Sequence, residues 1–146
     1  MKNKGFTIVE LIVVIVVMGL LSLLAIPAFR GLFTGSRLEE ARNGVVAFYQ
    51  RVNRYATTEG VNYVLEVNPA KDSLRCMKEG LADVKDGVGL RSGLDLVGGT
   101  ITFTVEPDGF VRDNSGTRNF SIYDNDTKDS LVFYISPLGI MEVERK

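Results

Sequence analysis

The spacing of apolar residues changes from one end of the chain to the other. Residues 11–29 contain no charged side chain, which is typical of a helix surrounded by apolar material. Further on, apolar residues recur every three or four positions, at Leu38, Ala41, Val45, Phe48, Val52 and Tyr55. This spacing places all six on one face of a helix, and we expect that face to pack on a sheet. Gly60 predicts the end of this helix.

After Gly60 the apolar residues alternate with polar ones. The segment from Ile101 to Val105 alternates strictly, which predicts a strand with one buried and one solvated face. Turn signals rich in Gly, Pro and Asn separate the candidate strands. We predict strands at residues 63–67, 74–77, 100–105, 110–112, 119–123, 131–136 and 140–144. The predicted fold class is α+β, with a long N-terminal helix packed against antiparallel β-sheets.

Composition narrows the chemistry. The chain has 146 residues, a net charge of −1 and no histidine, which excludes Ser-His-Asp and Cys-His catalytic machinery and removes the commonest metal ligand. The net charge does not favour an anionic partner such as nucleic acid. Cys76 is the one cysteine, so no intramolecular disulfide forms, and we interpret it as a buried apolar residue.

The N-terminal segment admits three interpretations. A secretory signal peptide fits poorly, because the apolar run exceeds the usual ~7–15 residues and no A-x-A cleavage site follows it. A plain membrane anchor fits residues 11–29, since about 20 apolar residues span a bilayer as a helix. Lys2 and Lys4 would then keep the N-terminal tail in the cytoplasm. Neither interpretation explains Glu10, because a carboxylate at the edge of a membrane helix costs on the order of 2–3 kcal/mol.

The third interpretation is a prepilin. Residues 5–11, with the sequence GFTIVEL, resemble the processing site of the type IV pilin and pseudopilin family. The resemblance implies that prepilin peptidase cleaves after Gly5 and that Phe6 becomes the N-methylated first residue. It also implies an assembly role for Thr7 and for Glu10, whose carboxylate sets the register against the N-terminal amine of a neighbouring subunit. A buried carboxylate and a buried ammonium are each costly alone, and pairing recovers much of that cost.

Pro27 extends the resemblance, because family members often carry a helix-kinking proline at this distance from the cleavage site. A plain helix stop is the alternative for Pro27 taken alone. Gly31 and Gly35 each weaken a helix by about 1 kcal/mol, and Ser36–Glu39 has the form of a capping box that would start a new helix. The family has one long helix instead, so we expect a continuous but bent helix.

The C-terminal half resembles the H-type minor pseudopilins of type II secretion and related minor pilins (GspH/FimT-like). The resembling features are Ala41-Arg42 on the helix, a strand after Gly60, the turn after Phe103 at residues 107–109 and the closing hairpin at residues 135–140. This implies a minor pseudopilin that joins a periplasmic pseudopilus. The alternative is a minor type IV pilin of a pilus or competence system, with DNA binding as a further property.

These interpretations give four segments. Residues 1–5 are the leader peptide, residues 6–30 a transmembrane and filament-core helix, residues 31–60 its amphipathic continuation, and residues 61–146 an antiparallel β domain. The expected location is the bacterial inner membrane with the C-terminal domain in the periplasm. The expected partners are prepilin peptidase, other pilin or pseudopilin subunits and membrane lipid, and DNA is not expected.

No enzyme, cofactor or metal is expected. The loop with Asp124, Asp126 and Asp129 is a weak calcium candidate, because closely spaced carboxylates are the ligands that Ca²⁺ prefers. It lacks the glycine and the bidentate glutamate of an EF-hand, and Asp and Asn are also ordinary loop residues.

Overall fold

A computed structural model describes the backbone of residues 8–146 and the side chains of residues 8–22 and 37–146. The chain divides into two compact units, residues 1–36 and 37–146. Helix α1 (Ile8–Glu59) begins in the first unit and ends in the second. It passes through Ser36 without interruption, so the capping box starts no new helix and the predicted continuity is confirmed. In the described part of the chain, no helical segment is both long and apolar enough to qualify as a membrane span.

In the second unit, α1 contributes the predicted apolar face to the core. Leu38, Val45, Phe48 and Val52 are at most 1% exposed, and Ala41 and Tyr55 are partly buried against them. The helix ends at Glu59 as predicted. Gly60 has φ +64° and donates its N–H to the Ala56 carbonyl over 2.9 Å, which is a left-handed helix end that glycine adopts at little cost.

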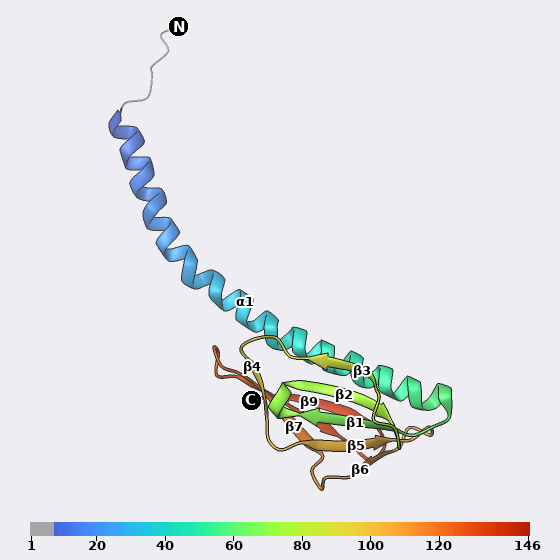
Figure 1. The fold of residues 1–146 in the computed structure, drawn as a ribbon. Coiled ribbons are helices and arrows are strands. Elements are labelled where there is room, and N and C mark those ends of the chain that lie inside the picture. Colours follow the sequence, from blue (N-terminus) through green and yellow to red (C-terminus); the bar gives the residue numbers. More distant parts are fainter. Residues whose placement is uncertain (1–7) are drawn as a thin grey trace. The chain divides into compact units, whose positions relative to one another are not determined.

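The strands of the second unit form two antiparallel sheets (Figure 1). The first has the order β3-β2-β1-β5-β6 and the second the order β4-β7-β8-β9. A short 3₁₀ turn, η1 (Pro69–Lys71), joins β1 to β2. The strand bounds are β1 Tyr63–Asn68, β2 Ser73–Lys78, β3 Val84–Gly89, β4 Leu94–Val97, β5 Ile101–Val105, β6 Val111–Asp113, β7 Asn119–Asp124, β8 Ser130–Ile135 and β9 Met141–Arg145.

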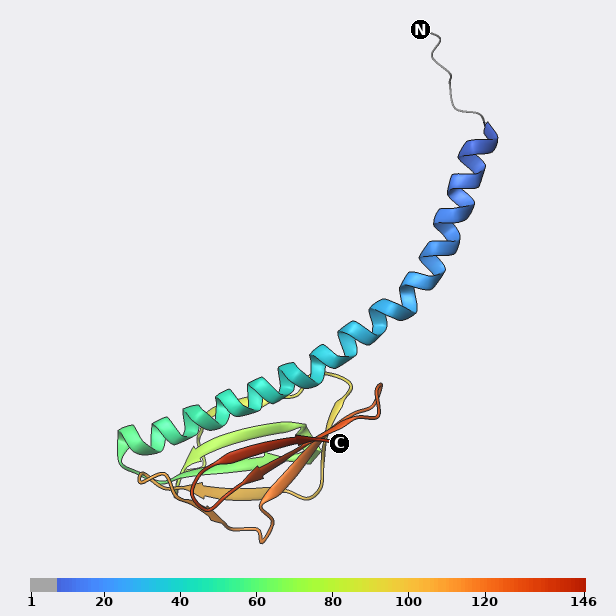
Figure 2. The same ribbon diagram turned by 180° about the vertical axis from the view of Figure 1, so that it is seen from behind.

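The core lies between α1 and the inner faces of the sheets, which Figure 2 shows from behind. It joins the helix face to fully buried side chains of both sheets, among them Leu65, Phe103 and Phe133. Cys76 on β2 is fully buried, as predicted, and burial raises the pKa of its thiol. The α+β arrangement of a long helix on antiparallel sheets is therefore confirmed.

Two strands were not predicted. The seven predicted strands correspond to β1, β2, β5, β6, β7, β8 and β9, with ends that differ by at most a residue or two. β3 contains two glycines and has no buried residue, and β4 has only four residues. β3 is attached to α1 by charge instead: Arg51 pairs with Asp86 over 2.7 Å, and Lys85 pairs with Glu59.

Candidate functional site

The described residues of the first unit expose apolar side chains on every side of α1. All residues from Ile8 to Ser22 are exposed, and the large apolar side chains among them range from 47% for Val17 to 80% for Ile8. A helix that is apolar all round is normally buried in protein or lipid, and soluble monomers rarely expose a contiguous apolar surface of this kind. This surface therefore requires an apolar environment, and we call residues 8–22 the apolar helix segment.

Ser22, the one hydroxyl in the apolar helix segment, is satisfied within the helix. Its Oγ donates to the Met18 carbonyl over 2.8 Å. A serine that bonds back to the preceding turn needs no water, so it is compatible with apolar surroundings.

Glu10 is the one charged side chain of the apolar helix segment. It lies in the first turn of α1, where the helix dipole favours a carboxylate, and its neighbours Val9 and Leu11 are exposed by 69% and 58%. A carboxylate that enters an apolar environment without a cationic partner costs several kcal/mol. The structure thus places Glu10 in the first turn of the apolar helix segment.

The other predicted assembly residues fall outside what the structure describes. Gly5, Phe6 and Thr7 precede the first described residue. Pro27 lies within the span of α1, but its side chain is outside the described residues. The proposed roles of these four residues stay predictions.

The acidic loop after β7 does not form a ligand set. Asp126 pairs with Arg37 over 2.7 Å, and Asp129 pairs with Arg145. Asp124 is fully buried and has no ion pair among the described residues. Among the residues that the structure describes, no group of three His, Cys, Asp or Glu side chains is placed to hold a metal ion.

Asp124 organises the loop instead. Burial opposes its charged form, but hydrogen bonds from the N–H groups of Asp126 and Thr127 outweigh burial and hold the pKa of Asp124 below its ordinary value. The Asp126 N–H lies 2.8 Å from Asp124 Oδ1. The Asp124 carboxylate thus stabilises the turn from which Asp126 and Asp129 pair with their arginines.

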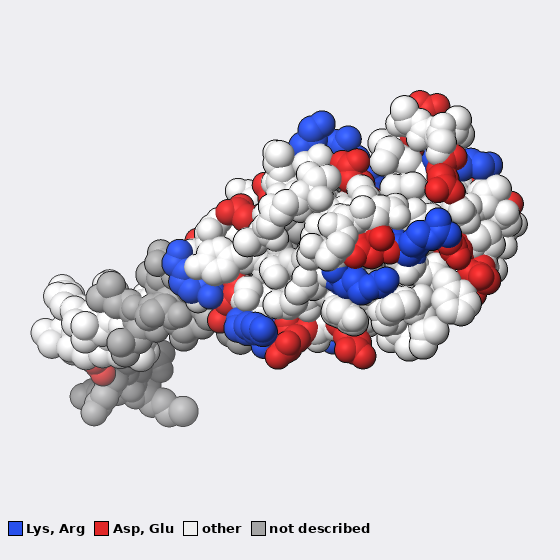
Figure 3. All heavy atoms as spheres, turned by 90° about the horizontal axis from the view of Figure 1, so that it is seen from below, with Lys and Arg blue, Asp and Glu red and all other residues white. Residues whose placement is uncertain are grey.

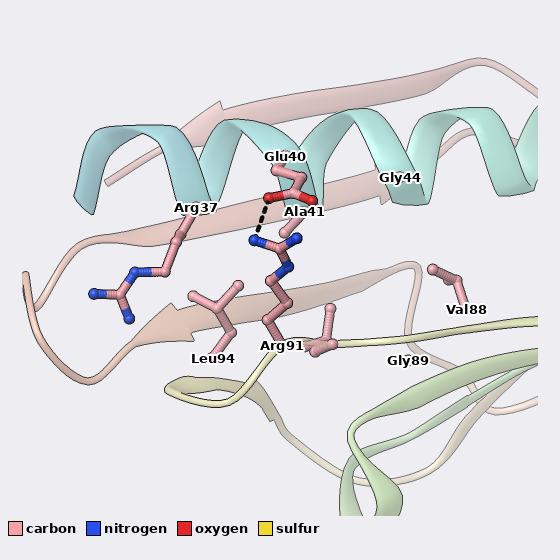
Figure 4. A pocket seen from close by; sticks show the side chains of 9 residues that line it. Arg37, Glu40, Ala41, Gly44, Val88, Gly89, Arg91 and Leu94 are labelled. Carbon is pink, nitrogen blue, oxygen red and sulfur yellow. Dashed lines mark ion pairs between the residues drawn. The ribbon is translucent and has the colours of Figure 1, made fainter. Parts of the chain in front are cut away.

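A groove lies between α1 and the connection from β3 to β4 (Figure 4). Its volume is about 200 Å³. The floor is apolar, with Ala41, Gly44, Val88, Leu90 and Leu94. Arg37, Glu40 and Arg91 stand at the rim, and Figure 4 shows the Arg91–Glu40 ion pair of 3.0 Å across it. We call this feature the helix–loop groove.

Sequence analysis did not identify the helix–loop groove. Its floor comes partly from β3 and β4, the two strands that the pattern did not predict. The available signal was the pair of small residues Ala41 and Gly44 on the helix face, one turn apart. Gly89 lines the groove on the opposite side, so three small residues surround the hollow.

Comparison with known protein families and curated proteins gives three matches. The family model of the prokaryotic N-terminal methylation motif matches residues 1–26. The fimbrial protein EcpC of Eikenella corrodens is 36% identical over 59 residues, which are 40% of this chain and 39% of that protein. A fimbrial protein of Moraxella nonliquefaciens is 27% identical over 91 residues, or 62% of this chain and 49% of that protein. The matches thus span half or less of the length of these relatives.

Comparison with solved structures shows the fold. The type IV minor pilin FimU of Pseudomonas aeruginosa matches with a TM-score of 0.57 at 21% identity, over 75% of this chain and 89% of that one. The minor pseudopilin EpsH from the type 2 secretion system of Vibrio cholerae gives a TM-score of 0.48 at 16% identity, over 72% of this chain and 96% of that one. The second unit and the helix that enters it have the fold seen in FimU.

Proposed function

We propose that this chain, a member of the type IV pilin and pseudopilin family, is a minor subunit of a type IV filament. In this proposal prepilin peptidase cuts after Gly5, Phe6 is N-methylated, and the mature chain joins other pilin-like subunits. The observation that carries the proposal is the apolar helix segment, exposed on every side and bearing one carboxylate, joined to a domain of pilin fold. In a filament, the apolar helix segment would be buried among other subunits and the domain of pilin fold would be exposed.

We further propose that residues 6–30 hold the unassembled subunit in the inner membrane, with residues 37–146 in the periplasm. The absence of charge from residues 11–29 supports the anchor, and Lys2 and Lys4 before it support the orientation. On assembly the same residues would leave the lipid and pack in the filament core. Their activity is structural, and the proposal includes no catalytic step.

Glu10 would set the axial register during that transfer. Glu10 is the one charged side chain of the apolar helix segment, so a neighbour that brings a positive charge to it, such as the free amine of a cleaved subunit, is favoured at one axial position. A neighbour that is one turn out of register would hold its amine about 5 Å away from the Glu10 carboxylate along the helix axis.

The test compares Glu10→Ala with Glu39→Ala, which removes an exposed carboxylate from the same helix in the second unit. Cleavage and incorporation into sheared filaments are measured for both variants in a strain that lacks the native copy. We expect both variants to be cleaved, and only Glu10→Ala to be missing from filaments. Normal incorporation of Glu10→Ala would remove the role that we assign to this residue.

Two kinds of filament are candidates for the assembly that this subunit joins. The likeness to FimU and to two fimbrial proteins supports a pilus, which we place first. The sequence features at residues 107–109 and 135–140 support the pseudopilus of type II secretion, which is the second candidate. Deletion of the gene separates them, because loss of surface pili with normal protein secretion supports the first and the reverse supports the second.

DNA binding is not part of the proposal. On the face of the molecule in Figure 3, basic and acidic side chains alternate rather than gather by sign. Several arginines are already paired, among them Arg37, Arg51 and Arg145. Loss of Lys2 and Lys4 leaves 17 − 2 = 15 basic against 18 acidic residues in the mature chain. A gel shift at two salt concentrations tests this, since phosphate contacts give strongly salt-dependent affinity.

A further inference from the structure

Strand β3 is weakly held within its own sheet. It lies at the outer edge of the first sheet, pairs with β2 on one side, and none of its residues is buried. Gly87 and Gly89 bring no side chain to the strand, and glycine inside a strand weakens it. The register with β2 also shifts between Cys76 and Met77, which interrupts the ladder. The ladder alone therefore gives β3 little stability.

Three ion pairs attach β3 and the residues just after it to α1. They are Lys85–Glu59, Asp86–Arg51 and Arg91–Glu40. Their six side chains are between 21% and 68% exposed. Exposed ion pairs are weak and are screened by salt, because the Debye length falls to about 3 Å at 1 M ionic strength. We call residues 84–91 the strap.

Apolar packing between the strap and α1 is incomplete. Val88 and Leu90 reach the core only as partly buried side chains. The helix–loop groove, of about 200 Å³, is lined on one side by the strap and on the other by Ala41 and Gly44 of α1 (Figure 4). A hollow forfeits the van der Waals contacts that its lining would otherwise make. The strap is therefore held on the helix largely by charge.

Cys76 lies next to the strap, on β2, and is fully buried. It stands opposite Asp86 in the ladder. Burial is the largest cause of the raised pKa of its thiol, and the charges of Asp86, Lys85 and Arg51 act on it as well. If the strap left, β2 would become the edge strand of the sheet. Access to Cys76 therefore reports whether the strap is closed.

We propose that the strap opens as a unit while the rest of residues 37–146 stays folded, and that ionic strength controls this opening. Opening breaks the three ion pairs and the β2–β3 ladder and uncovers the outer edge of β2. Local openings occur where buried apolar contacts are few and backbone hydrogen bonds are exposed. An uncovered edge presents N–H and C=O groups that pair readily with another chain, so the strap controls when this edge is available. This inference goes beyond the proposed filament function and does not rest on it.

The test measures the rate at which Cys76 is alkylated in the purified full chain, held in a non-ionic detergent. N-ethylmaleimide is the reagent because it is uncharged, so salt does not alter its approach to the thiol. Cys76 is the one cysteine of the chain, and mass spectrometry therefore follows a single modification. The rate is compared at about 0.05 M and about 1 M NaCl, where the Debye length differs several-fold.

Two variants separate the strap from the rest of the sheet. Arg51→Gln removes the partner of Asp86 in the strap. Arg112→Gln is the matched control, because it removes an exposed ion pair with Glu106 at the opposite edge of the same sheet.

We expect alkylation of the wild-type chain to be about three- to tenfold faster at high salt. At low salt Arg51→Gln should react about two- to fivefold faster than the wild type, and Arg112→Gln should match it. A rate that does not change with salt, or an equal increase for the two variants, would overturn the proposal.

Urea distinguishes opening of the strap from unfolding of the whole second unit. Opening of the strap exposes little surface, so alkylation below the unfolding transition should depend only weakly on urea, whereas global unfolding depends on it steeply. Hydrogen exchange on the same samples should become faster with salt in residues 84–91 and stay unchanged in β7 and β8. Alkylation with the steep urea dependence of global unfolding, or exchange that rises equally in β7 and β8, would show that the strap does not open alone.

Discussion

Substitution of Gly139 by alanine tests the packing of the β8–β9 turn against the β5–β6 turn, which are joined by a hydrogen bond of 2.9 Å from the Val111 N–H to the Pro137 carbonyl. Gly139 has φ +73°, and an alanine Cβ would overlap the Gly109 carbonyl oxygen. Gly109 is the matched control, because it has φ +90° at the equivalent turn position but no atom within 4 Å of an added Cβ. Both variants therefore place an L-residue in a left-handed conformation, and only Gly139→Ala adds a clash.

The expected magnitudes differ accordingly. The left-handed conformation costs roughly 1–2 kcal/mol for a residue with a Cβ, which is the whole effect expected for Gly109→Ala. Overpacking against backbone adds about 1–3 kcal/mol. Displacement of the turn from the Tyr49 hydroxyl adds about 1 kcal/mol. The free energy of unfolding should therefore fall about 2–4 kcal/mol further for Gly139→Ala than for Gly109→Ala.

The assay is urea unfolding followed by tyrosine fluorescence. All five tyrosines lie in residues 37–146 and the chain has no tryptophan, so the signal reports only the second unit. A thermal scan should show the same order, with a gap of roughly 10 °C between the two variants. If both variants lose the same stability within about 0.5 kcal/mol, the close approach of the two turns is wrong.

Three further predictions concern the second unit and use the same unfolding assay. Phe133→Ala removes a fully buried ring that stacks on a second phenylalanine at 4.9 Å, and should cost about 3–5 kcal/mol; a loss below 1 kcal/mol would contradict its burial. Tyr49→Phe removes the hydroxyl that donates to the Gly139 carbonyl and should lower the free energy of unfolding by about 1 kcal/mol, whereas no change would mean that this hydrogen bond contributes nothing. The hydrogen bond from Arg51 lowers the pKa of Asp86 below its ordinary 3.8, so the stability that this pair contributes is present above about pH 4 and lost as pH falls through the lowered value. Arg51→Gln should therefore be less stable than wild type by about 0.5–1 kcal/mol at pH 7, since the pair is partly exposed, and the difference should shrink towards pH 2; a constant difference across that range would refute the assignment.

Much of the second unit could be predicted because burial imposes a period on the sequence. The helix face with Val45 and Val52 and the strict alternation of residues 101–105 each follow from one element packing on one core. Gly60 marked the end of the helix because only glycine adopts a left-handed helix end at little cost. Continuity of α1 through Gly31 and Gly35 followed from the family resemblance, against the local signal.

The remaining features of the second unit could not be predicted because they leave no periodic pattern of apolar residues in the sequence. β3 contacts α1 through Arg51–Asp86 and Lys85–Glu59, and ion pairs between distant segments leave no pattern in either. The arginine partners of Asp126 and Asp129 are likewise far away in sequence, so the loop could be interpreted as a weak calcium candidate. The helix–loop groove likewise arises only where β3 and the segment after it pass α1.

The central claim, a processed subunit within a filament, is tested most directly by mass spectrometry of this chain recovered from sheared filaments. The account predicts a chain that lacks residues 1–5 and begins with N-methylated Phe6. The chain found only in the membrane fraction, still beginning at Met1, would contradict it.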